Sequence, residues 1–245
     1  MNIAFPPKDT LKQLMKFLYS ARLLAVGACL VLLLGFPAVT SIPAQTPAGA
    51  NQEAQQRKTS KPYTGDLSAF EYKDRDKKLQ IERVMDILGI GPGKNVADIG
   101  AGSGWFSVRA ARRVTRTGLV YAVDINSDAI HYIEERAHRE NINNMRTILS
   151  RPDDPLLPPE SIDAVLLLKT YHEVAEPIAL MKNLRKALRP GARVGVIDRN
   201  GDAENHGVSR DIVVREARQA GYTLVAEYNF VKSDNEDYFL VLEAR

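Results

Sequence analysis

The chain has 245 residues, of which 44% are hydrophobic, and this length allows one moderate α/β domain with a short appendage. It carries 33 Lys and Arg side chains against 30 Asp and Glu. The segment Met1–Arg22 holds four basic and one acidic side chain and accounts for the whole excess, so the remainder is neutral and has no net field to attract nucleic acid. We therefore expect no nucleic-acid partner.

The N-terminal part of the chain has the pattern of a targeting segment. Leu23–Val39 is an uncharged, mostly apolar run that follows four basic side chains. A basic region before an apolar run is typical of a signal peptide or membrane anchor, and the length of this run lies between a signal core and a full membrane span. We predict residues 1–50 as a signal peptide or anchor. The domain would then be exported or membrane-anchored, with a cytoplasmic-facing orientation left open.

Residues 51–76 are expected to form a linker and an N-terminal cover. Ser41–Lys61 is rich in Pro, Ala, Gln, Thr and Lys without hydrophobic periodicity, which indicates a flexible linker. Tyr63–Tyr72 carries scattered aromatic residues and is expected to fold over a site. Apolar residues then follow helical spacing from Lys77 to Leu88, and Gly91-Pro92-Gly93 ends that helix. The main domain is predicted over residues 77–245.

The most informative motif is the segment Val96–Phe106, which reads VADIGAGSGWF. A short apolar run predicts a buried strand, which breaks into a turn with glycines at 100, 102 and 104 and then into a helical pattern. A helix that starts there would direct unpaired backbone N–H groups at a ligand above the turn. The position of the third glycine of a dinucleotide-binding fingerprint is Trp105, which argues against an NAD-dependent oxidoreductase.

The acid-x-Gly-x-Gly-x-Gly pattern that starts at Asp98 resembles motif I of the class I S-adenosylmethionine (SAM)-dependent methyltransferases. The resemblance implies that the turn binds SAM through Gly100, Ala101, Gly102 and Gly104, with Asp98 supporting the methionine end. A second apolar strand ends at Asp124, at a distance from the glycine turn that suits a ribose-binding acid. In that family this acid binds the ribose hydroxyls, and Asp124 followed by Ile125 matches it.

The rest of the chain alternates between strand and helix patterns, which predicts a doubly wound, mostly parallel sheet. Two final strands joined by the short turn Lys232–Glu236 must be antiparallel. This α/β arrangement, a mostly parallel seven-stranded sheet with a C-terminal antiparallel hairpin, resembles the class I methyltransferase fold. The predicted strands are 95–99, 119–124, 145–149, 162–168, 193–198, 223–230 and 238–244, and the predicted helices are 105–114, 127–140, 178–188 and 209–220.

Two further segments fit the family. Asp153 and Asp154 lie in a proline-bracketed loop where family members place an acid that accepts from the adenine amino group, and the sequence does not separate the two. Lys169-Thr170-Tyr171-His172-Glu173 follows the fourth predicted strand, at the edge where open α/β sheets bind ligands. Its "YHE" run resembles a group of uncharacterised predicted methyltransferases that are distantly related to quinone C-methyltransferases. We include Lys169 among the cofactor-binding residues.

The acceptor end is assigned from side-chain chemistry. His172 has the pKa range of a general base, and Tyr171 could position an acceptor, although both could instead pack beneath the next helix. Asp198 and His206 follow the fifth predicted strand, in a segment that often closes over the acceptor. His131 and His138 are expected to face solvent. No cluster shows metal-ligand spacing, so no metal is predicted.

The sequence thus predicts methyl transfer from SAM to a small or lipid-like acceptor. The alternatives are a non-catalytic SAM-binding domain at the cell envelope and, with less support, an NAD-dependent oxidoreductase. Neither the acceptor atom nor the oligomeric state follows from the residues.

Overall fold

The structure is a computed structural model that describes residues 57–231 and 237–245. The predicted signal or anchor segment lies outside these residues, as does the predicted turn Lys232–Glu236. None of the helices in the described part of the chain is both long and apolar enough to cross a membrane.

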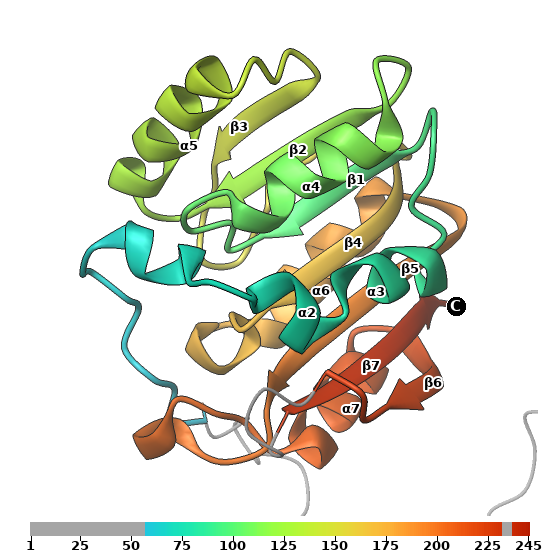
Figure 1. Ribbon diagram of the computed structural model, residues 1–245. Coiled ribbons are helices and arrows are strands. Elements are labelled where there is room, and N and C mark those ends of the chain that lie inside the picture. The colour runs from blue at the N-terminus through green and yellow to red at the C-terminus, as the bar shows by residue number, and fades with distance from the viewer. Residues whose placement is uncertain (1–56, 232–236) are drawn as a thin grey trace, which may run out of the picture. The chain divides into compact units, whose positions relative to one another are not determined.

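Seven strands form one sheet in the order β3-β2-β1-β4-β5-β7-β6 (Figure 1). The first five run parallel, and β7 is antiparallel to both of its neighbours, β5 and β6. This confirms the predicted α/β class and the antiparallel C-terminal pair. The strands are β1 (Asn95–Ile99), β2 (Leu119–Asp124), β3 (Met145–Leu149), β4 (Ile162–Leu168), β5 (Leu188–Arg199), β6 (Tyr222–Tyr228) and β7 (Asp237–Ala244).

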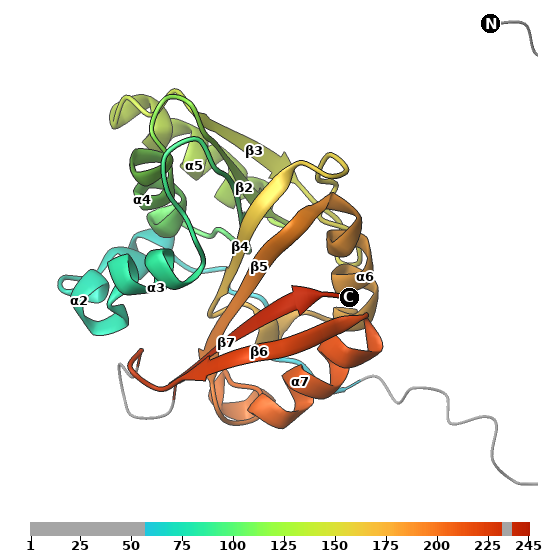
Figure 2. The ribbon, with the colours of Figure 1, turned by 90° about the vertical axis from the view of Figure 1, so that its right-hand side faces the viewer.

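Helices cover both faces of the sheet (Figure 2). One face carries α2 (Arg75–Leu79), α3 (Ile81–Ile87), α4 (Trp105–Val114) and α5 (Ser127–Arg139), and the other carries α6 (Pro177–Ala187) and α7 (Arg210–Gln219). Short 3₁₀ turns are η1 (Leu67–Glu71), η2 (Tyr171–Glu173) and η3 (Ala203–Asn205).

The prediction of a single helix from Lys77 to Leu88 is wrong. The structure has two helices here, α2 and α3, which are separated by Gln80. That residue takes a left-handed φ of 48°, which interrupts the helical hydrogen-bond pattern although the apolar spacing continues through it.

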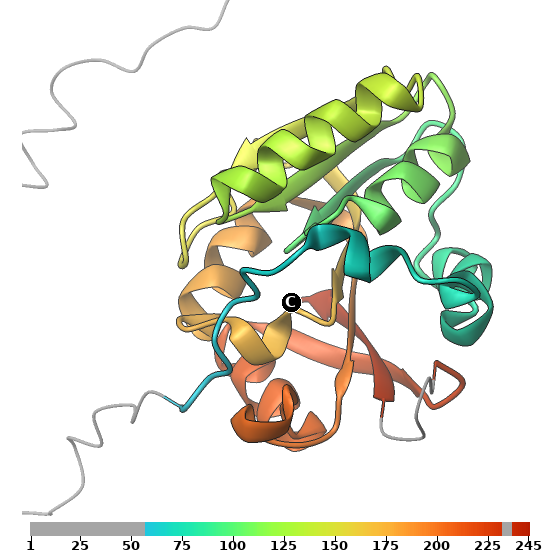
Figure 3. The same ribbon diagram turned by 60° about the vertical axis from the view of Figure 1, so that its left-hand side comes forward.

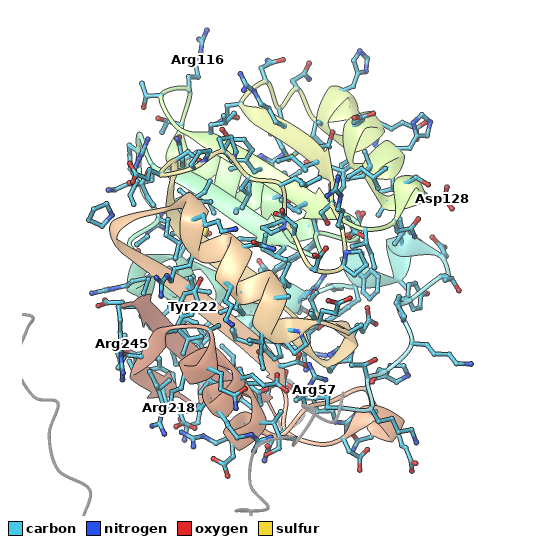
Figure 4. The ribbon with its side chains drawn as sticks, turned by 180° about the vertical axis from the view of Figure 1, so that it is seen from behind. Arg57, Arg116, Asp128, Arg218, Tyr222 and Arg245 are labelled. Atoms are coloured by element: carbon cyan, nitrogen blue, oxygen red, sulfur yellow. The ribbon has the colours of Figure 1, made fainter. Side chains whose placement is uncertain are left out.

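The core consists of two large apolar layers, one on each face of the sheet, as expected for a parallel sheet that is covered on both sides. On the α6–α7 side, the fully buried Tyr222 donates its hydroxyl to the carbonyl of Met181, at 2.9 Å (Figure 4). On the other side, Phe106 of α4 and Val84 of α3 pack over β1 and β4. The two core layers therefore hold the strands whose carboxyl ends form the candidate site.

Residues 57–74 run along the carboxyl ends of the strands, from the β5–α7 loop to the turn after β1 (Figures 1 and 3). Only residues 57–61 of the predicted flexible linker Ser41–Lys61 are described, and they are held against the domain. Arg57 donates to the carbonyl of Tyr171 at 2.8 Å and pairs with Glu216 at 3.2 Å, and the backbone N–H of Ser60 donates to the carbonyl of His172. Figure 4 shows Arg57 near the start of α6. These contacts attach the segment to the domain.

Candidate functional site

The candidate site lies where the carboxyl ends of β1, β2, β4 and β5 meet. The chain passes from β1 to β2 on one side and places β4 on the other side of β1. This reversal of strand order makes a topological switch point, which is where open α/β sheets bind ligands.

The turn after β1 depends on its glycines. Gly100, Gly102 and Gly104 have φ of 71°, 54° and 68°, which L side chains rarely adopt. A Cβ atom at Gly100 would lie 2.2 Å from Cγ2 of Thr170, so this position excludes any side chain. The Oγ atom of Ser103 in the same turn is buried and has no hydrogen-bond partner among the described residues. The turn therefore offers a close backbone approach and an unsatisfied polar atom, both of which suit a bound ligand.

Asp98, at the end of β1, is only 2% exposed. Its carboxylate accepts a hydrogen bond of 2.6 Å from the hydroxyl of Ser107 on α4. Burial raises the pKa of Asp98 to about 7, although the Ser107 hydrogen bond and the nearby Arg75 guanidinium act in the opposite direction. Asp98 thus links the end of β1 to α4, the two elements that flank the glycine turn.

Asp124, at the end of β2, joins the two halves of the site. Its carboxylate accepts from the backbone N–H groups of Gly102, at 2.8 Å, and Asn126, at 2.9 Å. Burial raises its pKa, and these backbone hydrogen bonds lower it. Ile125, the next residue, leaves 49% of its surface exposed, so it presents an apolar side chain beside the carboxylate.

The cover predicted from the aromatic residues passes over this turn. A Cβ atom at Gly102 would lie 3.6 Å from the Phe70 ring. Glu71 pairs with Arg136 of α5 at 2.8 Å and accepts from the hydroxyl of Tyr132 at 2.9 Å. These contacts hold η1 close to the glycine turn.

Asp153 and Asp154, in the loop after β3, differ in the hydrogen bonds that they make. Asp154 accepts from the backbone N–H of Leu156 at 2.9 Å, which is local turn building, whereas the backbone carbonyl of Asp153 accepts from Asn183. Lys169, which we predicted to bind the cofactor, has its side chain engaged elsewhere. Its ammonium pairs with Asp237 of β7, which lies on the opposite side of β4 from the glycine turn.

Tyr171 and His172 both lie in η2, directly after β4. Tyr171 is fully buried in the core under α6 and α7, as expected if it packs beneath the next helix rather than positions an acceptor. Burial and the Glu216 carboxylate raise the pKa of its hydroxyl well above the ordinary value. Its burial depends on the packing of α6 and α7, which the local sequence does not show.

His172 is held in one orientation by Asp198 at the end of β5. The Asp198 carboxylate lies 2.8 Å from Nδ1 of the imidazole and accepts from the backbone N–H of His172 at 3.0 Å. Because a carboxylate accepts, Nδ1 is the donor of this pair, and Nε2 is the ring nitrogen that Asp198 does not engage. Nε2 lies 3.7 Å from the carboxylate of Glu173. Burial raises the pKa of that carboxyl to about 7.

His206 completes this end of the site. It follows η3, which Asp202 caps, and lies with its ring centroid 6.1 Å from that of His172. One donor atom from each of His172, Glu173 and His206 lies within 4.8 Å of the others. Sequence spacing missed this cluster because the two histidines are far apart along the chain and only the neighbouring ends of β4 and β5 bring them together. His131 and His138 are exposed on α5, as predicted.

Comparison with known proteins supports the interpretation of the glycine turn. Residues 96–191 match the family model described as "Methyltransferase domain". A ubiquinone/menaquinone biosynthesis C-methyltransferase of Hydrogenovibrio crunogenus is 25% identical over 122 residues, 49% of this chain and 48% of the relative. A 2-phytyl-1,4-naphtoquinone methyltransferase of Trichormus variabilis is 27% identical over 118 residues, 48% of this chain and 52% of the relative. The match thus spans about half the length of these curated relatives.

A solved structure, a SAM-dependent methyltransferase from Aquifex aeolicus, superimposes with a TM-score of 0.66 at 21% identity, covering 73% of this chain and 98% of that one. This likeness confirms the fold. Residues 96–191, which hold the glycine turn and both strand-ending aspartates, thus match a methyltransferase domain, and the described part of the chain has the class I methyltransferase fold.

Proposed function

We propose that this protein transfers a methyl group from SAM to a small or lipid-like acceptor. The observation that carries the proposal is the contact between Asp124 and Gly102. It places a buried carboxylate against a left-handed glycine turn at the topological switch point. Quinone methyltransferases among the relatives support an acceptor of small, apolar character.

In this proposal each part of the turn has a binding role. Gly100, Gly102 and Gly104 allow the backbone to approach the cofactor closely, and Asp124 accepts from the ribose hydroxyls with the lone pairs that the backbone N–H groups leave free. Asp98 keeps the turn in place beside the methionine end. Asp153 takes the adenine amino group, because Asp154 is engaged in its own turn, and Ile125 contacts the adenine ring.

The chemistry that SAM supplies is an activated methyl group on a sulfonium. Transfer forms a bond between the methyl carbon and the acceptor and breaks the carbon–sulfur bond, which leaves a neutral thioether. The protein's contribution is to align the two reactants in line and to exclude water. Such positioning can lower the activation barrier by several kcal/mol, on the order of 7–11 at most. The cover from Phe70 to Arg75 closes the cofactor side of this site.

The proposal is tested by methyl transfer from isotopically labelled SAM. The full chain is incubated with labelled SAM and a panel of phenols, hydroquinones and their isoprenoid forms, and label in the organic extract is counted. We expect transfer to at least one apolar acceptor and its loss in Asp124→Ala. SAM binding without transfer to any acceptor in the panel would favour the alternative of a non-catalytic SAM-binding domain.

We also propose that the domain is exported or held at the membrane, on the basis of the basic residues and the apolar run Leu23–Val39. A reporter fused after Arg245 that is active only outside the cytoplasm tests this. Activity of this reporter supports export. Activity only of a second reporter that works in the cytoplasm contradicts export and leaves a membrane anchor with the domain facing the cytoplasm.

A further inference from the structure

The acceptor edge contains a group of side chains that the proposed binding of SAM does not use. His172 and Glu173 come from η2 and His206 from the segment after η3, and their donor atoms lie within 4.8 Å of one another. Two imidazoles and one carboxylate are a ligand set that binds zinc and other divalent first-row metals and leaves coordination positions open.

The orientation of His172 favours a cation between these groups. Asp198 accepts from Nδ1, so Nε2 is the ring nitrogen that is directed toward the Glu173 carboxylate. At 3.7 Å the two atoms are too far apart for a hydrogen bond. Ligands at metal bond lengths of about 2.1 Å stand about 3.4 Å apart in a tetrahedral site, so the observed separation is close to that of two ligands of one ion.

The surroundings have the features of a supported metal site. Asp198 is fully buried and accepts from the non-ligating nitrogen of His172, which is the carboxylate–histidine arrangement that orients metal ligands. His206 takes a left-handed φ of 53°, a conformation that costs energy in a non-glycine residue. Its loop is fastened to residues 57–60 by a hydrogen bond from Ser60 to the carbonyl of Ala203 and by the Lys58–Glu204 pair.

We propose that His172, Glu173 and His206 bind one divalent transition-metal ion, with Asp198 as the positioning residue. The metal site itself is independent of SAM. Its role rests on the proposed function, in which the open coordination positions would take an oxygen of the acceptor and promote loss of its proton to solvent water. This assigns His172 as a ligand rather than as the general base.

The test is metal binding by the full chain, after removal of bound metal with a chelator and dialysis. Zn²⁺ is titrated by calorimetry, and Co²⁺ is titrated by its visible absorption, which distinguishes a low-coordinate protein site from a hydrated ion. We expect one ion per chain in both titrations. This experiment needs neither SAM nor an acceptor, so its failure would not affect the proposed methyltransferase activity.

Variants separate the site from adventitious binding. His206→Gly removes an exposed imidazole and keeps the left-handed backbone, and Glu173→Gln removes the carboxylate charge. Each should lower the affinity about 10-fold or more, and Asp198→Asn about 10–100-fold. The matched control is His131→Ala, which removes an exposed histidine that lies 3.4 Å from Glu135 on α5. It should bind as the wild type does.

Two results would overturn the proposal. One is the absence of a one-to-one complex with either ion in the wild type. The other is unchanged affinity in both His206→Gly and Glu173→Gln when thermal melting shows that the variants are folded.

Discussion

Removal of the Asp124 carboxylate should weaken both the fold and the binding of SAM. The carboxylate accepts from two backbone N–H groups, at 2.8 and 2.9 Å, and each hydrogen bond to a charged group is worth about 1.5–3 kcal/mol net. Desolvation of the carboxylate offsets part of this, as its raised pKa indicates, and water can reach the freed donors at a position that is 9% exposed. We expect Asp124→Ala to lower the free energy of unfolding by about 2 kcal/mol.

The effect on SAM follows from the lost ribose contact. We expect affinity to fall by about 1.5–3 kcal/mol, roughly 10- to 150-fold, in protein that is still folded. Asp124→Asn keeps one acceptor oxygen and should have an intermediate effect on stability. Asp128→Ala is the matched control, because Asp128 is an exposed carboxylate in the first turn of α5 (Figure 4).

The assay for stability is urea unfolding followed by tryptophan fluorescence. Trp105 is the single tryptophan of the chain and is 3% exposed beside the glycine turn, with the guanidinium groups of Arg75 and Arg109 over its ring at 4.4 and 3.9 Å. Its emission therefore reports on unfolding of the site. Calorimetry with SAM on the same samples gives the affinity. Wild-type stability and affinity in Asp124→Ala would refute the reasoning for both roles of this residue.

Three further predictions concern the turn and its cover. Burial raises the pKa of Asp98 from 3.8 to about 7, so the folded state keeps this proton to a higher pH, and the free energy of unfolding should fall as pH rises from about 4 to about 7. Urea titrations over this pH range should show that Asp98→Asn removes about 3–4 kcal/mol of this decrease in the free energy of unfolding. An unchanged pH profile in the variant would contradict a raised pKa for Asp98. Gly100→Ala should destabilise by about 2–4 kcal/mol through its φ and the clash with Thr170, whereas Gly191→Ala, with a similar φ but open space around it, should cost about 1 kcal/mol by the same assay. Glu71→Ala should lower SAM affinity about threefold with little change in melting temperature. A clear drop in melting temperature beside the loss of affinity would show that Glu71 has only a structural role.

The central strands β1, β2 and β4 were predictable from the sequence because they are buried on both faces of the sheet and are continuous apolar runs. The bounds of β1, β2, β3 and β4 agree with the prediction. β5 starts at Leu188 rather than at the predicted residue 193, because a register shift lets Leu188 pair with Ile162.

The candidate site was predictable only where it is local in sequence. The glycine turn and Asp124 follow from motif spacing, but contacts between distant segments do not. Arg57 and Glu216 are 159 residues apart, and no periodicity predicts that they meet. The burial of Tyr171 and the pairing of Lys169 with Asp237 depend in the same way on how α7 and β7 pack.

The central claim, that the glycine turn and Asp124 form a SAM site, is tested most directly by competition calorimetry on the full chain. We predict one-to-one binding of SAM and of its demethylated product with micromolar affinity, and no displacement of SAM by excess NAD. Binding of NAD in preference to SAM would contradict the account.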